Sequence, residues 1–156
     1  MEINKLFDVS GKVVVVTGGS RGIGEMITAG FLANGAKVYI SARKAPALME
    51  KAKELSERYN GECIAIPCDL SNTDGMDYFV QQISENEKGI DYLRNNAGAA
   101  WGEPLEDFSE TGWDKVMDLN VKSIFFLTQK LKSLLKTNAT IDDPSRVINI
   151  GSIDGL

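Results

Sequence analysis

Histidine is missing from this sequence, and cysteine and proline are scarce: its 156 residues include two cysteines and four prolines. Without an imidazole side chain, the protein has neither a histidine base nor a histidine ligand for a metal ion. The two cysteines, Cys63 and Cys68, form no zinc or redox motif, so we expect two free, buried thiols. We therefore predict no metal site.

Long apolar runs and an excess of positive charge are missing as well. No stretch reaches the length of a membrane-spanning helix. The N-terminus, MEINKLFDVSGK, has neither the apolar core of a signal peptide nor the arginines of a transit peptide. The 17 basic residues are outnumbered by 22 acidic ones, whereas nucleic-acid binders usually carry a basic face. We expect a cytoplasmic protein with no nucleic-acid and no membrane partner.

What the sequence does contain is an ordinary globular composition, with 43% hydrophobic and 25% charged residues. A chain of this length can bury a hydrophobic core of its own. No repeat, low-complexity tract or linker divides it. We expect a single domain over residues 1–156.

The stretch VVVVTGGSRGIG, residues 13–24, organises the rest of the chain. Four β-branched residues followed by spaced glycines predict a buried parallel strand, a tight turn and a helix beginning near residue 21. Glycine tolerates a positive φ and lets a ligand approach the backbone closely, and the first amides of a helix attract phosphate. The stretch therefore predicts a dinucleotide pyrophosphate site, although an ordinary strand-to-helix turn is the alternative. The predicted contact residues are Gly18, Ser20, Arg21, Gly22, Ile23 and Gly24.

Strands and helices alternate along the whole sequence, which is typical of a parallel α/β sheet with right-handed crossovers. We predict a Rossmann-type three-layer α/β sandwich of five strands in the order 3-2-1-4-5, with the ligand at the carboxyl ends of the strands. The predicted strands are 13–17, 37–41, 62–67, 90–95 and 146–150. The predicted helices are 21–34, 45–59, 73–87 and 121–136, with a short helical segment between 106 and 120.

Apolar stripes predict which face of each helix is buried. In the first helix the stripe is Ile23, Ile27, Gly30 and Phe31. In the last helix it is Val121, Ile124, Phe125, Thr128 and Leu131.

Together with the threonine at position 17, TGGSRGIG resembles the cofactor motif of the short-chain dehydrogenase/reductase family. Two later motifs add to the resemblance: NNAG at 95–98, which closes the fourth predicted strand, and VINIGS at 147–152. The resemblance implies a nicotinamide cofactor and hydride transfer to a carbonyl carbon. In NNAG, small and amide residues let the backbone approach the cofactor ribose, so Asn95 is a predicted cofactor residue, and the amides also tie neighbouring strands together.

The end of the second predicted strand indicates NADPH as the cofactor. An acidic residue there would bind the ribose 2′-hydroxyl and repel a 2′-phosphate, but position 42 is alanine. Arg43 can pair with the phosphate, and Arg21 can reach the same group. The alternative is that Arg43 is a solvated surface charge.

Asp69 and Leu70, after the third predicted strand, resemble the adenine pocket of the family. The carboxylate of Asp69 would accept a hydrogen bond from the adenine amino group, and Leu70 would cover the ring. The alternative for Asp69 is a helix N-cap.

Two catalytic residues follow from the resemblance. Asn120 matches the asparagine that helps to hold a water in the proton relay of the family, and Ser152 matches the serine that hydrogen-bonds the substrate carbonyl. The tyrosine that supplies the proton, and the lysine that lowers its pKa, would lie beyond Leu156. Without this general acid we expect transfer to slow by about 10²–10⁴. The chain therefore looks like an N-terminal fragment of a family member. We expect it to be inactive by itself.

Within the family, the segments AWG at 100–102 and GWDKVM at 112–117 resemble 3-oxoacyl-[acyl-carrier-protein] reductases of the rhamnolipid-biosynthesis type. The implied substrate is an acyl thioester or a similar small carbonyl compound, with a homo-oligomer as the full-length form. Trp101 would line the substrate mouth, or be a core or rim aromatic residue. The alternative function is a truncated paralogue that only binds NADPH or pairs with a full-length relative.

Two features depart from the family pattern. Arg94 occupies a position in the fourth strand that is aliphatic in the family, and an unpaired buried guanidinium costs several kcal/mol. We expect Arg94 to reach solvent or a carboxylate, and otherwise a poorly stable chain. The sheet is also expected to be incomplete at its C-terminal edge, because the fifth strand would be a bare edge.

Overall fold

The five predicted strands form one parallel sheet in the order β3-β2-β1-β4-β5 in the computed structural model, which describes residues 7–152. The predicted order is therefore confirmed, and each strand lies within two residues of its predicted bounds. The strands are β1 (Val13–Thr17), β2 (Lys37–Ala42), β3 (Cys63–Pro67), β4 (Tyr92–Asn95) and β5 (Arg146–Asn149). The helices are α2 (Gly22–Ala33), α3 (Ala45–Tyr59), α4 (Thr73–Asn86), α5 (Glu110–Met117) and α6 (Ser123–Thr137).

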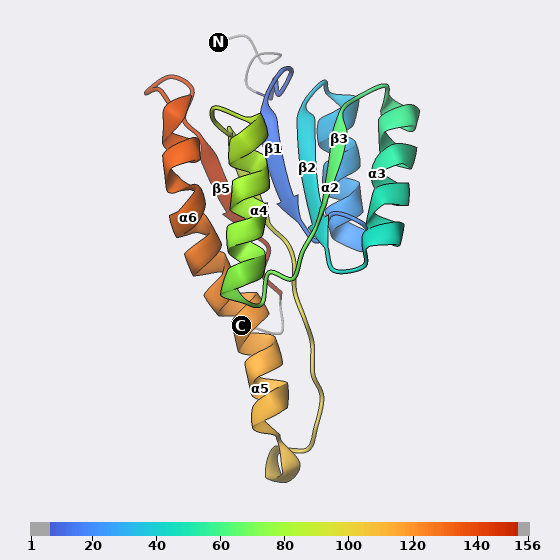
Figure 1. Ribbon diagram of the computed structural model, residues 1–156, viewed down its shortest axis with the longest axis vertical. Coiled ribbons are helices and arrows are strands. Elements are labelled where there is room, and N and C mark those ends of the chain that lie inside the picture. The colour runs from blue at the N-terminus through green and yellow to red at the C-terminus, as the bar shows by residue number, and fades with distance from the viewer. Residues whose placement is uncertain (1–6, 153–156) are drawn as a thin grey trace.

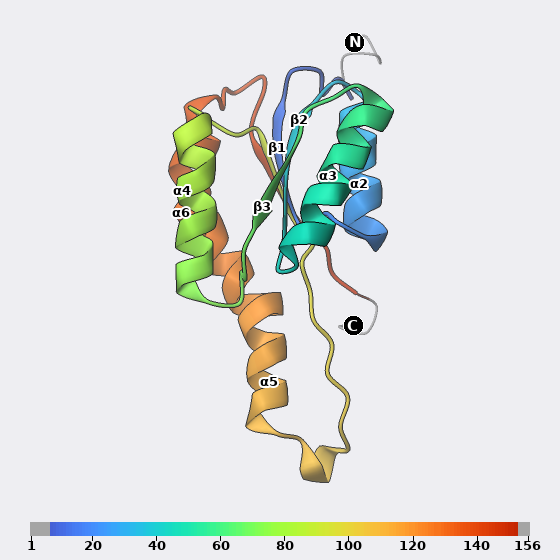
Figure 2. The ribbon, with the colours of Figure 1, turned by 45° about the vertical axis from the view of Figure 1, so that its right-hand side comes forward.

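Helices cover the sheet on both faces (Figures 1 and 2). The helices α2 and α3 lie on one face, and α4 and α6 lie on the other. Each face has its own core: Val14 and Val16 of β1 point toward α2 and α3, and Val15 points toward α4 and α6. This alternation explains the continuous run of valines, because a central parallel strand is buried on both faces.

The buried face of α2 lies one position away from the predicted stripe. Gly24, Thr28 and Leu32 are buried, whereas Ile23 is 61% exposed. The helix begins so close to the preceding turn that a Cβ on Gly24 would lie 2.2 Å from the carbonyl oxygen of Gly18. The predicted face was therefore wrong. Close packing against the turn, which only small residues permit, decides which side of α2 is buried, and hydrophobicity does not.

The buried face of α6 also differs from the predicted stripe. Its buried residues are Ser123, Leu127, Leu131 and Leu135, of which only Leu131 belongs to the stripe. Val121 and Phe125 are 53% and 63% exposed. The other four stripe residues instead line an apolar groove of about 630 Å³ beside β5. Within residues 7–152, β5 is the outermost strand on this side of the sheet.

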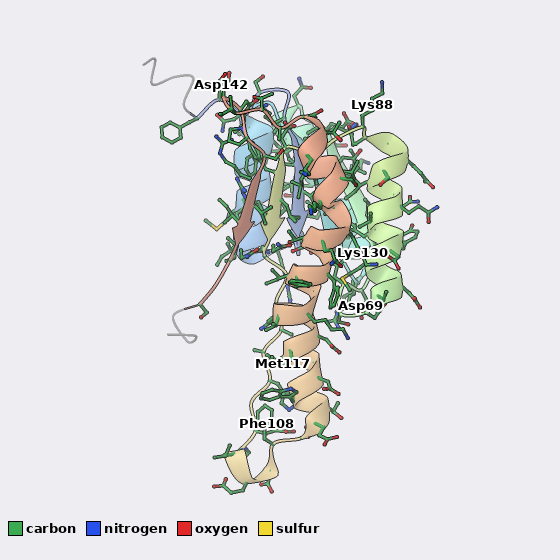
Figure 3. The ribbon with its side chains drawn as sticks, turned by 90° about the vertical axis from the view of Figure 1, so that its left-hand side faces the viewer. Asp69, Lys88, Phe108, Met117, Lys130 and Asp142 are labelled. Atoms are coloured by element: carbon green, nitrogen blue, oxygen red, sulfur yellow. The ribbon has the colours of Figure 1, made fainter. Side chains whose placement is uncertain are left out.

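An arm extends beyond the carboxyl ends of the strands. The chain runs out after NNAG, turns through a short 3₁₀ helix at Leu105–Asp107 and returns through α5, which continues into α6. Phe108 lies near the far end of the arm, and Met117 lies closer to the sheet (Figure 3). The predicted helical segment between 106 and 120 is therefore confirmed as α5, but it packs within the arm rather than on the sheet.

The two cysteines are free, as predicted, but each is half-buried rather than fully buried. Burial raises the pKa of the Cys63 and Cys68 thiols to about 12, so both are protonated at neutral pH. The helices between residues 7 and 152 include none that is both long and apolar enough to cross a membrane.

Candidate functional site

The glycine-rich turn after β1 is fixed to the loop after β4. The hydroxyl oxygen of Thr17 accepts hydrogen bonds from the backbone N–H groups of Asn96 and Ala97, both at 2.9 Å. The Asn96 side chain donates in turn to the carbonyl oxygens of Thr17 and Gly18, at 2.9 and 3.2 Å. β1 and β4 are neighbours at the point where the strand order reverses, which is where open α/β sheets bind ligands.

Two glycines make this turn possible. Gly18 has a φ of +67°, which favours glycine. Gly24 brings the start of α2 against the turn, where any side chain would collide with the Gly18 carbonyl. The N-cap residue of α2, Arg21, makes no side-chain cap hydrogen bond. The first amides of α2 therefore have no capping side chain and can donate to an anion.

A cavity of about 280 Å³ opens at this turn, and we call it the crevice. Eight of the ten predicted cofactor residues line it: Gly18, Ser20, Arg21, Ile23, Gly24, Arg43, Asp69 and Leu70. Seven further residues line it: Ser41, Ala42, Cys68, Asn96, Ala97, Gly98 and Leu119. Ala42 and the NNAG residues belong to motifs that the sequence had already placed near the cofactor, whereas sequence reasoning missed Ser41, Cys68 and Leu119. Ser41 and Cys68 lie at or next to the carboxyl ends of β2 and β3, so the rule that ligands bind at strand ends could have found both.

The other two predicted cofactor residues, Gly22 and Asn95, do not line the crevice. Asn95 is 3% exposed, and its amide donates to Asn149 of β5 at 2.9 Å and to Thr128 of α6 at 3.3 Å. It ties neighbouring elements together, as predicted, and it does not line the crevice, so its contact with a cofactor stays a prediction. Successive side chains of a strand point to opposite sides, and here the next residue, Asn96, reaches the crevice.

A second hollow, of about 910 Å³, adjoins the crevice, and four cations line it against two carboxylates, Glu50 and Glu54. Arg21, Arg43 and Lys44 line it, and none of the three forms an ion pair within residues 7–152. A fourth cation, Lys51, is already paired with Glu25 and Glu54. The three remaining positive charges make this end of the crevice suitable for an anionic group.

Asp69 lies in the crevice wall and does not cap α4. Its carboxylate accepts from the backbone N–H and the hydroxyl of Ser71, at 3.0 and 2.8 Å. The N-cap is Asn72, whose side chain accepts from the Gly75 N–H at 2.8 Å. The N-cap alternative for Asp69 was therefore wrong. Leu70, beside it, is nearly buried and also contributes to the crevice wall.

The two predicted catalytic residues lie outside the crevice wall. Asn120 is in a stretch of π-helix, Asp118–Lys122, between α5 and α6. Its side chain accepts from the Ala99 N–H at 2.8 Å and donates to the Ala99 carbonyl at 2.9 Å, which fixes the start of the arm. Single π turns are frequent at functional sites. Ser152 is exposed and follows β5 by three residues, at the same end of the sheet.

Trp101 supports the arm. A Cβ on Gly112 would lie 2.3 Å from its ring, so the indole rests directly on α5. The ammonium of Lys115 lies 4.3 Å from the ring centroid. Nearby, Glu103 accepts from the N–H and hydroxyl of Ser109, and these hydrogen bonds hold the pKa of its carboxyl below the usual range. Of the two predicted roles for Trp101, these contacts favour the rim aromatic.

A parallel sheet in this order, with a glycine-rich turn and a crevice at the carboxyl ends of its strands, defines a Rossmann-type α/β protein. The particular family follows from comparison with known sequences. The profile of the short-chain dehydrogenases matches residues 12–156. The chain belongs to this family.

Individual relatives agree with this assignment. The chain is 47% identical over 150 residues to the rhamnolipids biosynthesis 3-oxoacyl-[acyl-carrier-protein] reductase of Pseudomonas aeruginosa, covering 96% of this chain and 58% of the relative. It is 35% identical over 147 residues to dehydrogenase/reductase SDR family member 11 of Gallus gallus, covering 94% and 57%. The chain thus spans a little over half the length of these relatives.

Solved structures show the same fold. The P. aeruginosa RhlG/NADP active-site complex matches with a TM-score of 0.91 and 48% identity, over 96% of this chain and 57% of that one. L-Sorbose reductase from Gluconobacter frateurii, complexed with NADPH and L-sorbose, matches with a TM-score of 0.86 and 29% identity, over 94% and 55%.

Proposed function

We propose that the chain binds NADPH in the crevice and forms the cofactor-binding part of a reductase that acts on a 3-oxoacyl thioester or a similar carbonyl compound. The observation that carries the proposal is the crevice itself, which combines a glycine-rich turn, uncapped amides at the start of α2 and the unpaired cations Arg21 and Arg43. The cofactor seen with the P. aeruginosa relative and the substrate class in that relative's name agree with it.

Each part of the crevice fits one part of the cofactor. The amides of the first turn of α2 would hold the pyrophosphate, with Gly24 keeping the backbone accessible. Arg43 and Arg21 would pair with the 2′-phosphate, and alanine at position 42 leaves no carboxylate to repel it. Asp69 would accept from the adenine amino group, and Leu70 would cover the ring.

The bound cofactor would supply a hydride to the carbonyl carbon. Ser152 would hydrogen-bond the substrate carbonyl oxygen, and Asn120 would position the start of the arm through its two hydrogen bonds to Ala99. No tyrosine lines the crevice within residues 7–152. Tyr39 donates to Glu87 at 2.7 Å, and burial raises its pKa, so it is not available as an acid there. We therefore propose binding without efficient turnover by this chain alone.

A titration of the 156-residue chain with NADPH and NADH, followed by the fluorescence of the reduced nicotinamide, tests the proposal. We expect NADPH to bind more tightly. Arg43→Ala should weaken NADPH binding by roughly tenfold, because a charge-assisted contact to phosphate is lost, and leave NADH binding unchanged. Lys53→Ala is the matched control, since Lys53 lies on α3, carries the same charge and lines neither hollow.

Equal affinity for the two cofactors, or an unchanged NADPH affinity in Arg43→Ala, would contradict the NADPH assignment. Oxidation of NADPH in the presence of an acetoacetyl thioester tests the second half of the proposal. Turnover by the chain alone at the rate of a complete reductase would show that a proton donor other than a crevice tyrosine operates.

A further inference from the structure

The carboxylate of Asp69 uses only one of its two oxygens within the protein. The backbone N–H and the hydroxyl of Ser71 both donate to Oδ1, at 3.0 and 2.8 Å. Among residues 7–152, no group donates to the other oxygen, Oδ2, and no cation pairs with the carboxylate. Asp69 is half-buried, and Oδ2 is not among the buried atoms that lack a partner, so solvent reaches this oxygen. Because Asp69 lines the crevice, Oδ2 is a free acceptor at the proposed cofactor site.

The backbone around Asp69 is fixed from three sides. The N–H of the preceding residue, Cys68, donates to the Ala42 carbonyl at the end of β2, at 3.1 Å. The following residue, Leu70, is 4% exposed and belongs to the core on the α4 side of the sheet. On the third side, α4 begins so close to Asp69 that a Cβ on Gly75 would lie 1.9 Å from the Asp69 carbonyl oxygen. The position of the Asp69 Cα is therefore set before any ligand arrives.

The side-chain torsions of Asp69 are set by Ser71. The last torsion of an aspartate has a broad, shallow preference, so a carboxylate without partners would turn freely. Two hydrogen bonds to Oδ1 hold the carboxylate plane in one orientation. One of them comes from the backbone and is independent of the side chain at position 71, whereas the other depends on the hydroxyl. Ser71 does not line the crevice, so its hydroxyl can influence a ligand there only through Asp69.

We propose that Ser71 is a positioning residue, which aims Oδ2 of Asp69 at the exocyclic amino group of the cofactor base and so selects adenine over a 6-oxo purine. The inference rests on the proposed function, in which Asp69 accepts from that amino group. Adenine carries an N–H donor at C6, whereas hypoxanthine carries a carbonyl oxygen, which a carboxylate repels. A polar site that is left without its partner discriminates strongly against the wrong ligand, and a group that is already oriented loses little freedom on binding.

The alternative role for Ser71 is purely local. A serine two residues after an aspartate can close a turn at the start of a helix, with no effect on a ligand. Loss of the hydroxyl would then lower stability, or weaken the binding of every dinucleotide by the same factor. The ratio of the affinities for two cofactors that differ only at C6 of the purine therefore separates the two roles.

The test is a fluorescence titration with NADPH and with the reduced analogue in which hypoxanthine replaces adenine. We expect the wild type to bind NADPH roughly tenfold more tightly than the analogue, as for one hydrogen bond to a charged group. Asp69→Asn should abolish this preference, because its amide can donate to the 6-oxo group. Ser71→Ala should reduce the ratio to roughly threefold, since the backbone N–H still holds Oδ1. Its affinity for the analogue should stay within roughly twofold, which also shows that the variant is folded.

Two further variants grade the effect of the hydroxyl. Ser71→Thr keeps the hydroxyl and should keep the wild-type ratio. Ser71→Cys has nearly the same size but a weaker donor, so its ratio should lie between those of the wild type and Ser71→Ala.

Ser109→Ala is the matched control. The N–H and hydroxyl of Ser109 also donate to a single carboxylate oxygen, Oε2 of Glu103, at 2.8 and 2.9 Å. This pair lies in the arm, and neither residue lines the crevice. The substitution removes the same kind of hydrogen bond and should leave the ratio unchanged.

The outcomes distinguish this inference from the proposed function. Equal binding of the two dinucleotides by the wild type would overturn the inference while leaving NADPH binding in the crevice intact. The same conclusion would follow from an unchanged ratio in Ser71→Ala, or from a ratio in Ser71→Thr as low as in Ser71→Ala. Failure of the wild type to bind either dinucleotide would overturn the proposed function and this inference together.

Discussion

The corner between β1 and β4 and the edge formed by β5 and α6 are built on opposite principles. At the corner, Thr17 and Asn96 satisfy backbone groups of both loops, and glycine lets α2 close over them. At the edge, all four residues of β5 are exposed, and the α6 side chains beside them contribute to an open apolar groove. Within residues 7–152, the corner satisfies its backbone groups with its own side chains, whereas the edge exposes apolar surface.

The two regions are therefore stabilised by different interactions. The corner is held by directional hydrogen bonds and close contacts, so a single added methyl group or lost oxygen has a large effect. At the edge, α6 is held in place by the side opposite the groove, where Leu127 and Leu131 are buried in the core. Exposed edge strands are also templates for association. Substitutions in the two regions should therefore differ in size, and in whether they affect folding or binding.

The first prediction concerns the two sides of α6 at the edge. Leu127→Ala should lower the free energy of unfolding by about 3 kcal/mol, because Leu127 is 1% exposed and its loss leaves a cavity. Phe125→Ala, two residues earlier on the exposed side, should change it by less than about 0.5 kcal/mol. Urea denaturation of both variants measures the difference. The reverse order would mean that the stripe predicted from the sequence is the buried face after all.

The next effect tests the corner. Gly24→Ala should destabilise the chain by about 2.5 kcal/mol and abolish NADPH binding, because the new Cβ would lie 2.2 Å from the Gly18 carbonyl oxygen. Gly30→Ala is the matched control in the same helix, where a Cβ meets nothing within 4 Å. That variant should gain up to about 1 kcal/mol from helix propensity. Both are measured by thermal unfolding and cofactor titration. Similar results for the two variants would contradict the close packing of the turn.

These two pairs of variants also show where sequence reasoning succeeded and where it failed. The bounds of β1 and α3 were predicted correctly, because each segment fits one periodicity. β1 is a run of valines, and the buried residues of α3, Leu48, Ala52 and Leu55, recur at helical spacing. The face of α2 was not predicted correctly, since Gly24 is buried by close approach rather than by hydrophobicity. The face of α6 was ambiguous because the helix is apolar on two sides, and only the extent of the sheet decides between them.

The candidate site also contains some features that could be predicted from the sequence and others that could not. The glycine-rich turn, Arg43 and Asp69 line the crevice, and each belongs to a motif at a strand end. Their contact with a cofactor stays a prediction. Asn95 and Asn96 could not be told apart by sequence, since a shift of one residue in a strand exchanges its two faces. The hydrogen bonds of Asn120 to Ala99 could not be predicted either, because they join segments of the arm that no periodicity relates.

A third, smaller effect concerns the hydrogen bonds of the corner. Thr17→Val should cost about 2 kcal/mol, because it removes the acceptor for two backbone N–H groups in a position that is 2% exposed. Thr17→Ser keeps the hydroxyl and should cost less than half as much. Denaturant unfolding of the two variants isolates the oxygen from the change in volume. Equal losses would show that packing of the side chain, rather than the oxygen, holds the two loops together.

The last substitution is expected to stabilise the chain by a small amount. Its position, Arg94, connects the corner and the edge. The Arg94 carbonyl accepts from Thr17 at the corner, and Arg94 pairs in register with Ile148 at the edge. Arg94→Val should raise the free energy of unfolding by about 1 kcal/mol, because it removes a buried donor that lacks a partner and restores a residue that favours strands. The gain is small because the cation–π contacts with Phe31 and Tyr92 are lost as well. Of the residues that the structure describes, no carboxylate pairs with the guanidinium, so the expectation that Arg94 finds one was wrong, and these two rings take that place. Thermal unfolding of the variant and the wild type measures the gain. A destabilised Arg94→Val would show that the aromatic rings already compensate the buried charge in full.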